Sequence, residues 1–154
     1  MNIELWHMNP GPGATKDELS KVVLARFGLM PRKKDAKANF HRLLLELYER
    51  KKEAIKNKKP EQAVMNVDAM ALFADIKRQT MYDYLNRWVS LQIIKKTTFS
   101  SNAETTQGYE LNGNNLEAAF TRATAIINNH METSMEYIEE LQKEIKNEKL
   151  RSQE

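Results

Sequence analysis

The stretch from residue 66 to residue 96 constrains the fold of this chain most strongly, because its apolar residues follow helical spacing twice. Apolar residues three or four positions apart lie on one face of a helix. The first set is Val67, Met70, Ala71 and Ala74, and the second set is Met81, Leu85, Trp88 and Val89. We therefore expect two short helices that share a small core.

Polar residues around the first of these helices favour a tight turn into the second. Asn66 can cap its start, because the side-chain oxygen accepts a hydrogen bond from a backbone N–H that lacks an intrahelical partner. Asp75 lies where the backbone must reverse, and Asp tolerates the left-handed conformation better than most residues. With Ile76 packed at the turn, the segment has the layout of a helix-turn-helix.

The second helix carries hydrogen-bonding side chains on the face opposite its apolar residues. Such side chains can form hydrogen bonds with base edges in the major groove of DNA. They are Arg78, Gln79, Thr80, Tyr82, Asp83 and Asn86. The alternative is an ordinary solvent-exposed face, which most amphipathic helices have.

The residues that follow predict a β-hairpin. Ile93 and Ile94 begin a run that ends at Phe99, and a second run extends from Gly108 to Leu111. Residues 100–107 between them are rich in Ser, Asn and Thr, which predicts a long polar loop. A hairpin in this position corresponds to the wing of a winged helix.

Residues 38–112 resemble the winged helix-turn-helix family of archaeal and bacterial transcription regulators, most closely in the sequence IKRQTMYDYLNRWVSLQIIKK. A narrower resemblance is to the archaeal regulators of archaellum genes. Gln92 departs from the family pattern, which usually has Gly after the recognition helix. Since a non-glycine residue held left-handed costs about 1–2 kcal/mol, the C-terminal end of this helix is expected to differ or to absorb that cost.

The resemblance implies a recognition helix at about 77–91 in the major groove and a wing at 93–111 on the flanking backbone or minor groove. Gln and Asn suit adenine, and Arg suits guanine. Asp83 can accept from cytosine or can instead hold a neighbouring Arg or Lys in place. Base contacts are therefore expected from Arg78, Gln79, Tyr82, Asp83 and Asn86. Phosphate contacts are expected from Lys77, Thr80 and Arg87. Contacts from the wing are expected from Lys95, Lys96, Ser100, Ser101 and Asn102.

Two more helices are expected before this motif. Thr15 and Glu18 form a capping box for the first, whose buried face would be Leu19, Val22, Val23 and Phe27, ending at Gly28. The second would run from about Lys34 to Asn57 and bury Phe40, Leu43, Leu44, Leu47 and Tyr48. Residues 62–65 can supply a short strand that pairs with the wing.

Residues 116–151 contain no Pro or Gly and predict one long helix, on the order of 50 Å in length. Its apolar seam alternates in steps of four and three, as in a coiled coil, and includes Thr124 and Ser134. We expect it to form a homodimer through Phe120, Ile127, Met131, Ile138, Leu141 and Ile145. The alternative is that the first half folds back on the core and the tail frays.

The predicted fold is therefore mainly α with a small β-hairpin wing (α+β). Residues 1–32 would form an N-terminal arm and short helix, residues 33–112 the winged helix-turn-helix DNA-binding domain, and residues 113–154 the long dimerisation helix. At 154 residues the chain is long enough for one domain with extensions.

Charge is unevenly distributed along the chain. Residues 26–59 contain twelve Lys or Arg residues against four acids, whereas residues 116–154 contain eight acids against five bases. Such asymmetry favours a polyanionic partner for the basic part, although a basic stretch alone is often only a solvated helix face. The chain has no cysteine, no signal-peptide pattern and no apolar run that could span a membrane, so a cytoplasmic location is expected.

Sequence motifs do not favour an enzyme. We find no glycine-rich phosphate loop, HExxH or GxSxG pattern. His7, His41 and His130 are far apart, which argues against a metal site. The acidic residues Glu136, Glu139 and Glu140 are expected to form a solvated helix face. No cofactor, metal or small-molecule ligand is expected.

The predicted function is sequence-specific binding of double-stranded DNA by a transcription regulator. A dimer would read an inverted repeat whose half-sites lie one helical turn, roughly 34 Å, apart. Two alternatives are a winged helix that docks protein and an architectural protein that binds DNA independently of sequence. Whether such a regulator activates or represses depends on the position of its operator, which the sequence does not encode.

Overall fold

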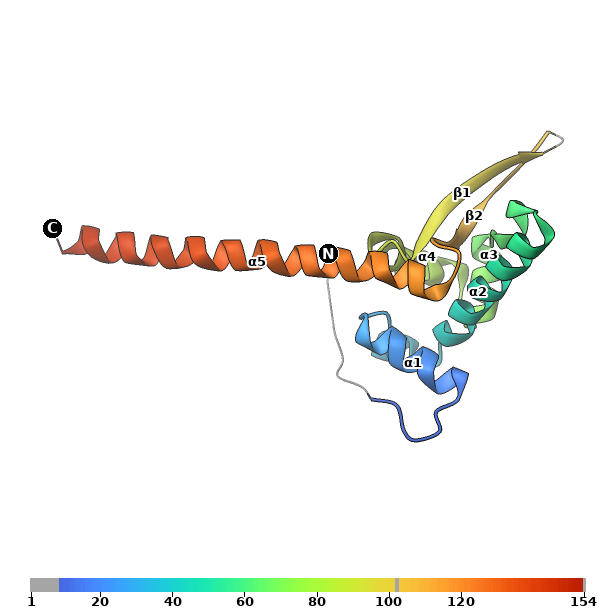
Figure 1. Ribbon diagram of the computed structural model, residues 1–154, viewed down its shortest axis with the longest axis horizontal. Helices are drawn as coiled ribbons and strands as arrows, with labels where there is room; N and C mark the ends of the chain where they lie inside the picture. Colours follow the sequence, from blue (N-terminus) through green and yellow to red (C-terminus); the bar gives the residue numbers. More distant parts are fainter. Residues whose placement is uncertain (1–8, 102, 154) are drawn as a thin grey trace.

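A bundle of helices, a two-stranded hairpin and a long projecting helix make up the chain (Figure 1). The computed structural model describes residues 9–101 and 103–153. The order of elements is that of a winged-helix-like topology: helices, then an antiparallel hairpin, then a C-terminal helix. The predicted fold class is therefore confirmed.

Five α-helices, two 3₁₀ turns and two strands are formed within the described residues. In chain order they are α1 (Lys16–Arg26), η1 (Lys33–Asp35), α2 (Phe40–Asn57), η2 (Pro60–Ala63), α3 (Val67–Ala74), α4 (Arg78–Ser90), β1 (Ile94–Ser101), β2 (Glu104–Leu111) and α5 (Leu116–Ser152).

Side-chain caps fix the starts of three helices. The Thr15 hydroxyl accepts from the backbone N–H of Glu18 at 3.2 Å, and Asn66 accepts from the N–H of Ala69 at 2.8 Å. Asn115 caps α5 in the same way through the N–H of Ala118 at 2.8 Å. The caps predicted at Thr15 and Asn66 are confirmed, since each satisfies a backbone donor without an intrahelical partner.

The α3–α4 turn forms as expected, with Asp75 left-handed at a φ of 56°. All four apolar residues predicted to be buried on α3 are buried. On α4, Met81, Leu85 and Trp88 are buried, but Val89 is 37% exposed and Tyr84 takes its place in the core. At about 100° per residue, position 84 lies about 40° from position 88 around the helix. Position 89 lies about 40° beyond position 85 on the other edge, a quarter turn from the centre of the buried stripe.

The N-terminal half of the chain differs from expectation in two places. On α1, Leu24 and Ala25 are buried, while the predicted core residue Leu19 is 46% exposed. Helix α2 begins at Phe40 rather than near Lys34. Residues 33–35 form a separate 3₁₀ turn, because the Asp35 carboxylate accepts a hydrogen bond from the Tyr84 hydroxyl and thus binds this turn to α4.

The hairpin also differs from the prediction of a long polar loop. Strand β1 continues to Ser101 and β2 begins at Glu104, so most of the Ser- and Thr-rich segment is paired. Thr106 lies opposite Phe99, and Thr105 lies opposite Ser100. Polar composition suggested a loop, but the β-branched Thr side chains favour extended backbone.

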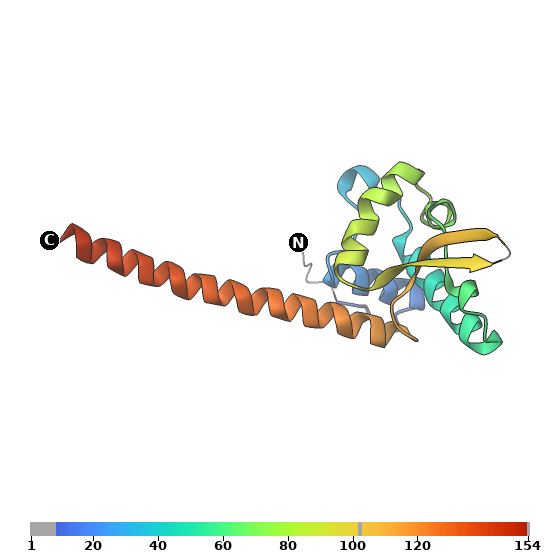
Figure 2. The same cartoon turned by 90° about the horizontal axis from the view of Figure 1, so that it is seen from above.

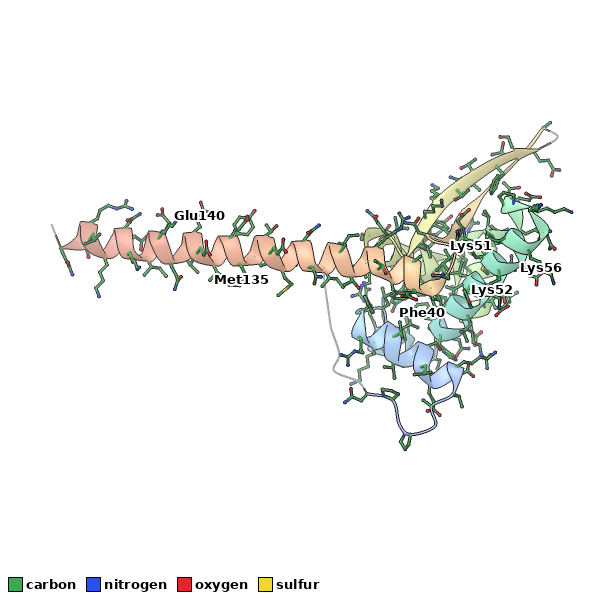
Figure 3. The ribbon with its side chains drawn as sticks, in the orientation of Figure 1. Phe40, Lys51, Lys52, Lys56, Met135 and Glu140 are labelled. Carbon is green, nitrogen blue, oxygen red and sulfur yellow. The ribbon has the colours of Figure 1, made fainter. Side chains whose placement is uncertain are left out.

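The core joins α1, α2, α3, α4, the base of the hairpin and the first turns of α5. Phe40 lies at its centre, with ring centroids 4.7 Å from Tyr84 and 6.1 Å from Trp88 in edge-to-face arrangements. Figure 3 shows Phe40 in the helical body, at the start of α2. This packing determines which face of α4 is buried.

Two contacts attach the hairpin to the helical body. Met65 and Tyr109 exchange two backbone hydrogen bonds of 2.8 Å, so the strand predicted at 62–65 is reduced to one bridge at Met65. Lys51 on α2 forms a 2.6 Å ion pair with Glu110, and both side chains are largely buried. The close approach requires Gly108, because a Cβ there would lie 2.3 Å from the Met65 carbonyl oxygen.

Gln92 adopts the left-handed conformation, with a φ of 59°. Helix α4 therefore ends with the backbone geometry expected of the usual Gly, and the remainder of the fold absorbs the cost of about 1–2 kcal/mol. The side-chain amide of Asn112 donates to the Gln92 carbonyl oxygen at 2.9 Å and holds this junction.

Helix α5 packs on the body only over its first turns. Ala119 and Ala123 are buried, and the Phe120 ring lies 4.8 Å from that of Phe27 on α1. Ile127 is half-buried against the core. From about Met131 onward the helix extends away from the body, as both views show (Figures 1 and 2).

We predict that Gly108→Ala lowers the free energy of unfolding by about 1–3 kcal/mol, because the added methyl group forces the hairpin away from Met65. Urea denaturation measures this change. The matched control is Gly11→Ala, where a Cβ meets nothing within 4 Å. Equal stability of the two variants would contradict the close approach.

Candidate nucleic-acid interface

The outward face of α4 is formed by polar side chains, as the sequence predicted. Burial of Met81, Tyr84, Leu85 and Trp88 turns the opposite side of the helix toward solvent. Five of the predicted base-contacting residues are exposed on that side: Arg78, Gln79, Tyr82, Asp83 and Asn86. Lys77 is exposed at the N-cap, whereas Thr80 and Arg87 are half-buried.

Arg78 is held at one edge of this face by its neighbours. Its guanidinium lies 5.8 Å from the centre of the Tyr82 ring, and one nitrogen lies 3.5 Å from the Tyr82 hydroxyl. Asp68 on α3 lies 3.5 Å from the guanidinium on the other side. The hydrogen bond with Tyr82 and the charge of Asp68 raise the pKa of Arg78, so this group stays cationic.

The hairpin and α4 enclose a notch of about 170 Å³. Arg78 and Tyr82 line it from α4, and Lys96 and Gln107 line it from the hairpin. Burial raises the pKa of the Tyr109 hydroxyl, which also lines the notch and so stays protonated. The notch brings together Arg78 of α4 and Lys96 of the hairpin, and it also contains Asp68 of α3, which pairs with Arg78.

Only one of the two predicted lysines of the wing belongs to this notch. Successive side chains of a strand point to opposite faces, so Lys95 lies on the face away from Lys96. There its ammonium lies 3.8 Å from Glu110. Sequence reasoning missed Gln107, which lies diagonally across from Lys96 in the hairpin; the alternation of the strand would have found it once the pairing was known.

The tip of the hairpin lies far from α4 (Figures 1 and 2). Ser100 is exposed near this end of β1. Asn102 and the side chain of Ser101 lie outside the described part of the chain. The predicted contacts of these three residues stay predictions.

On the other side of α4, Tyr84 binds the η1 turn. Its hydroxyl donates to Asp35 at 2.6 Å and accepts from the backbone N–H of Arg32 at 2.8 Å. Burial, together with the hydrogen bond to Asp35, raises the pKa of Tyr84, so the hydroxyl keeps its proton and its role as donor. Arg87, one turn further along α4, donates to the Gly28 carbonyl oxygen at 3.3 Å.

Part of the basic charge on α2 is neutralised within the chain. Lys51 pairs with Glu110, Arg50 lies 2.9 Å from Glu46, and Lys52 lies 3.5 Å from Glu49. In Figure 3, Lys52 and Lys56 lie toward the end of α2 that is remote from α5. The positive charge of residues 26–59 is thus less available to a polyanion than the sequence count suggests.

The described residues contain no group of three or more His, Asp or Glu residues that could hold a metal ion. His7 lies outside the described part, and His41 and His130 belong to different helices. Burial, followed by the charge of Lys21, lowers the pKa of His41. Over the described ranges, no helix combines the length and apolar character needed to cross a membrane.

We predict that Tyr84→Phe lowers the free energy of unfolding by about 1–3 kcal/mol, because Asp35 and the Arg32 N–H lose a part-buried partner. Tyr82→Phe on the exposed face of the same helix is the control, with an expected change within about 0.5 kcal/mol. Urea denaturation of both variants checks this, and equal values would show that the hydroxyl of Tyr84 does not bind the turn.

Comparisons of the chain with protein-family models, with curated proteins and with solved structures give no match.

Proposed function

We propose that the protein is a sequence-specific regulator that binds double-stranded DNA with α4 in the major groove. The observation that carries this proposal is the exposed polar face of α4, bordered by a hairpin whose Lys96 lies at the same notch as Arg78. An α-helix fits the major groove, and hydrogen-bonding side chains at its surface can distinguish base pairs there. The resemblance of residues 38–112 to winged helix-turn-helix regulators supports the same function.

The proposed contacts divide into base and phosphate contacts. Gln79 and Asn86 lie near the centre of the exposed face, where a bidentate amide suits adenine. Arg78 is restrained by Tyr82 and suits guanine, and Asp83 suits cytosine. Lys77 and Lys96 would contact phosphates, which position the protein without reading sequence.

We also propose that α5 pairs two copies of the chain. Beyond the body, its seam residues are exposed although they are apolar: Met131 is 55% exposed, Ile138 48%, Leu141 58% and Ile145 56%. In Figure 3, Met135 and Glu140 lie on opposite sides of this projecting part. A second copy would cover the apolar side and leave the acidic side in water. Phe120 and Ile127 contact their own body, so in a dimer they would lie beside the junction of the paired helices.

The seam favours parallel pairing. Ile138 and Ile145 occupy one core position of the heptad and Leu141 the other, an arrangement typical of two-stranded parallel coiled coils. Parallel, in-register pairing also brings Glu144 opposite Lys149 of the second copy, because these flank the seam five residues apart. Such a dimer places both winged helices at one end, as an inverted repeat requires.

Selection from a randomised pool of duplex DNA, followed by salt titration of the selected sequence, tests the DNA proposal. We expect an enriched inverted repeat and an affinity that falls steeply as salt rises. Asn86→Ala is expected to relax preference at one base pair of each half-site, with a loss of about 1–3 kcal/mol. Asn129→Ala, on exposed α5, is the matched control and should change neither affinity nor preference.

Other outcomes of the selection would identify the alternatives. Salt-sensitive binding without enrichment would indicate an architectural protein that binds DNA independently of sequence. No binding at low salt would indicate that the winged helix docks protein instead.

Light scattering during size-exclusion chromatography tests the dimer. The wild-type chain should elute with twice the 17.9 kDa mass of one copy, whereas Ile138→Asn/Leu141→Asn should elute as a monomer because polar groups enter both core positions of the heptad. Glu139→Asn/Glu140→Asn changes neighbouring residues outside the seam and should remain dimeric.

Charge-reversal variants of α5 test whether its two copies pair in parallel. In a parallel dimer, Glu144→Lys should lower the melting temperature and Glu144→Lys/Lys149→Glu should restore it, because the double change rebuilds the pair between copies. A double variant no more stable than the single one would contradict parallel pairing.

A further inference from the structure

A cationic hollow lies beside α4 on the side away from the hairpin. It has a volume of about 600 Å³ and is lined by Arg32 and Lys33 of the η1 turn and by Arg87 of α4, together with the small residues Ala25 and Gly28. Arg32 and Lys33 are adjacent in the chain, and Arg87 lies more than fifty residues further along. Within the described part of the chain, none of the three forms an ion pair with a carboxylate.

The hollow has a defined shape because Tyr84 fixes the turn to α4. The Tyr84 hydroxyl binds both Asp35 and the backbone of Arg32. The Arg32 guanidinium also lies 5.6 Å from the centre of the Tyr84 ring. Asp35 is the one acid of the η1 turn, and one of its carboxylate oxygens accepts the hydrogen bond from the Tyr84 hydroxyl. The backbone that carries Arg32 and Lys33 is therefore fixed against α4 rather than forming a free loop.

The hollow and the notch flank the proposed recognition face on opposite sides. At 100° per residue, Gln79, Asp83 and Asn86 lie near the middle of the exposed arc of α4. Arg78 and Tyr82 lie at the arc's edge facing the hairpin, and Arg87 lies at the other edge. Figure 2 shows the blue turn and the yellow hairpin on either side of α4.

We propose that Arg32, Lys33 and Arg87 form a second binding site for the phosphodiester backbone of duplex DNA. This inference rests on the proposed function, in which α4 occupies the major groove. The groove is about 12 Å wide and is bordered by one sugar-phosphate strand on each side. Lys96 and Arg78 lie toward one strand, and the cationic hollow lies toward the other. The η1 turn would thus contact one sugar-phosphate strand while the hairpin contacts the other.

Salt titration of the full chain with its selected duplex tests this site. Lys33→Gln should reduce the slope of log affinity against log salt by about 1 for each bound copy, and so by about 2 for the dimer, and should weaken binding about five- to tenfold per copy at 0.1 M salt. The loss should be similar for all duplex sequences, because phosphate contacts carry no sequence information. Lys33 is exposed, so thermal unfolding of the variant should match the wild type.

Lys146→Gln is the matched control, because it removes the same charge from the exposed part of α5. If the wild type binds DNA and both variants have its slope of log affinity against log salt, the hollow does not bind the DNA backbone. The proposal that α4 binds in the major groove would then be unaffected. If the wild type itself binds no duplex, the proposed function and this site both fail.

Discussion

The packing of α4 against Phe40 is the contact on which the other features depend. Tyr84 and Trp88 meet the Phe40 ring edge-to-face, and aromatic pairs of this kind add about 0.5–1.5 kcal/mol to the burial of their surface. More importantly, this contact sets the rotation of α4 about its own axis. A rotation of α4 by one residue, about 100°, would turn Tyr82 and Val89, or Thr80 and Arg87, toward the core and Trp88 toward solvent. The polar face would then no longer lie opposite Phe40.

Two further contacts bring neighbouring elements to the edges of that face. Gly108 allows the hairpin to approach Met65, and the buried pair of Lys51 with Glu110 holds it there. On the other edge, the Tyr84 hydroxyl holds the η1 turn. The same residue thus contributes its ring to the core and its hydroxyl to the surface, so stability and the layout of the proposed DNA-binding surface are coupled.

The start of α1 and most of the helix-turn-helix could be predicted because their determinants are local. The caps at Thr15 and Asn66 and the left-handed Asp75 depend on residues within a few positions of each other. The sequence-based predictions were wrong where the neighbouring residues do not determine the local backbone conformation. The polar residues around Thr105 suggested a loop although they pair as strand, and Lys33–Asp35 looked like the first turn of a helix although Tyr84 holds it as a separate turn.

The sequence by itself determined where α3, α4 and α5 lie and which face of α4 is polar, because helical spacing and capping act over a few residues. Only the tertiary structure decided that Lys96, not Lys95, lies at the notch, and that Arg32 and Lys33 lie beside Arg87. These juxtapositions depend on contacts such as Tyr84 with Asp35, which are 49 residues apart. No spacing rule links such residues, since only the packed core brings them together.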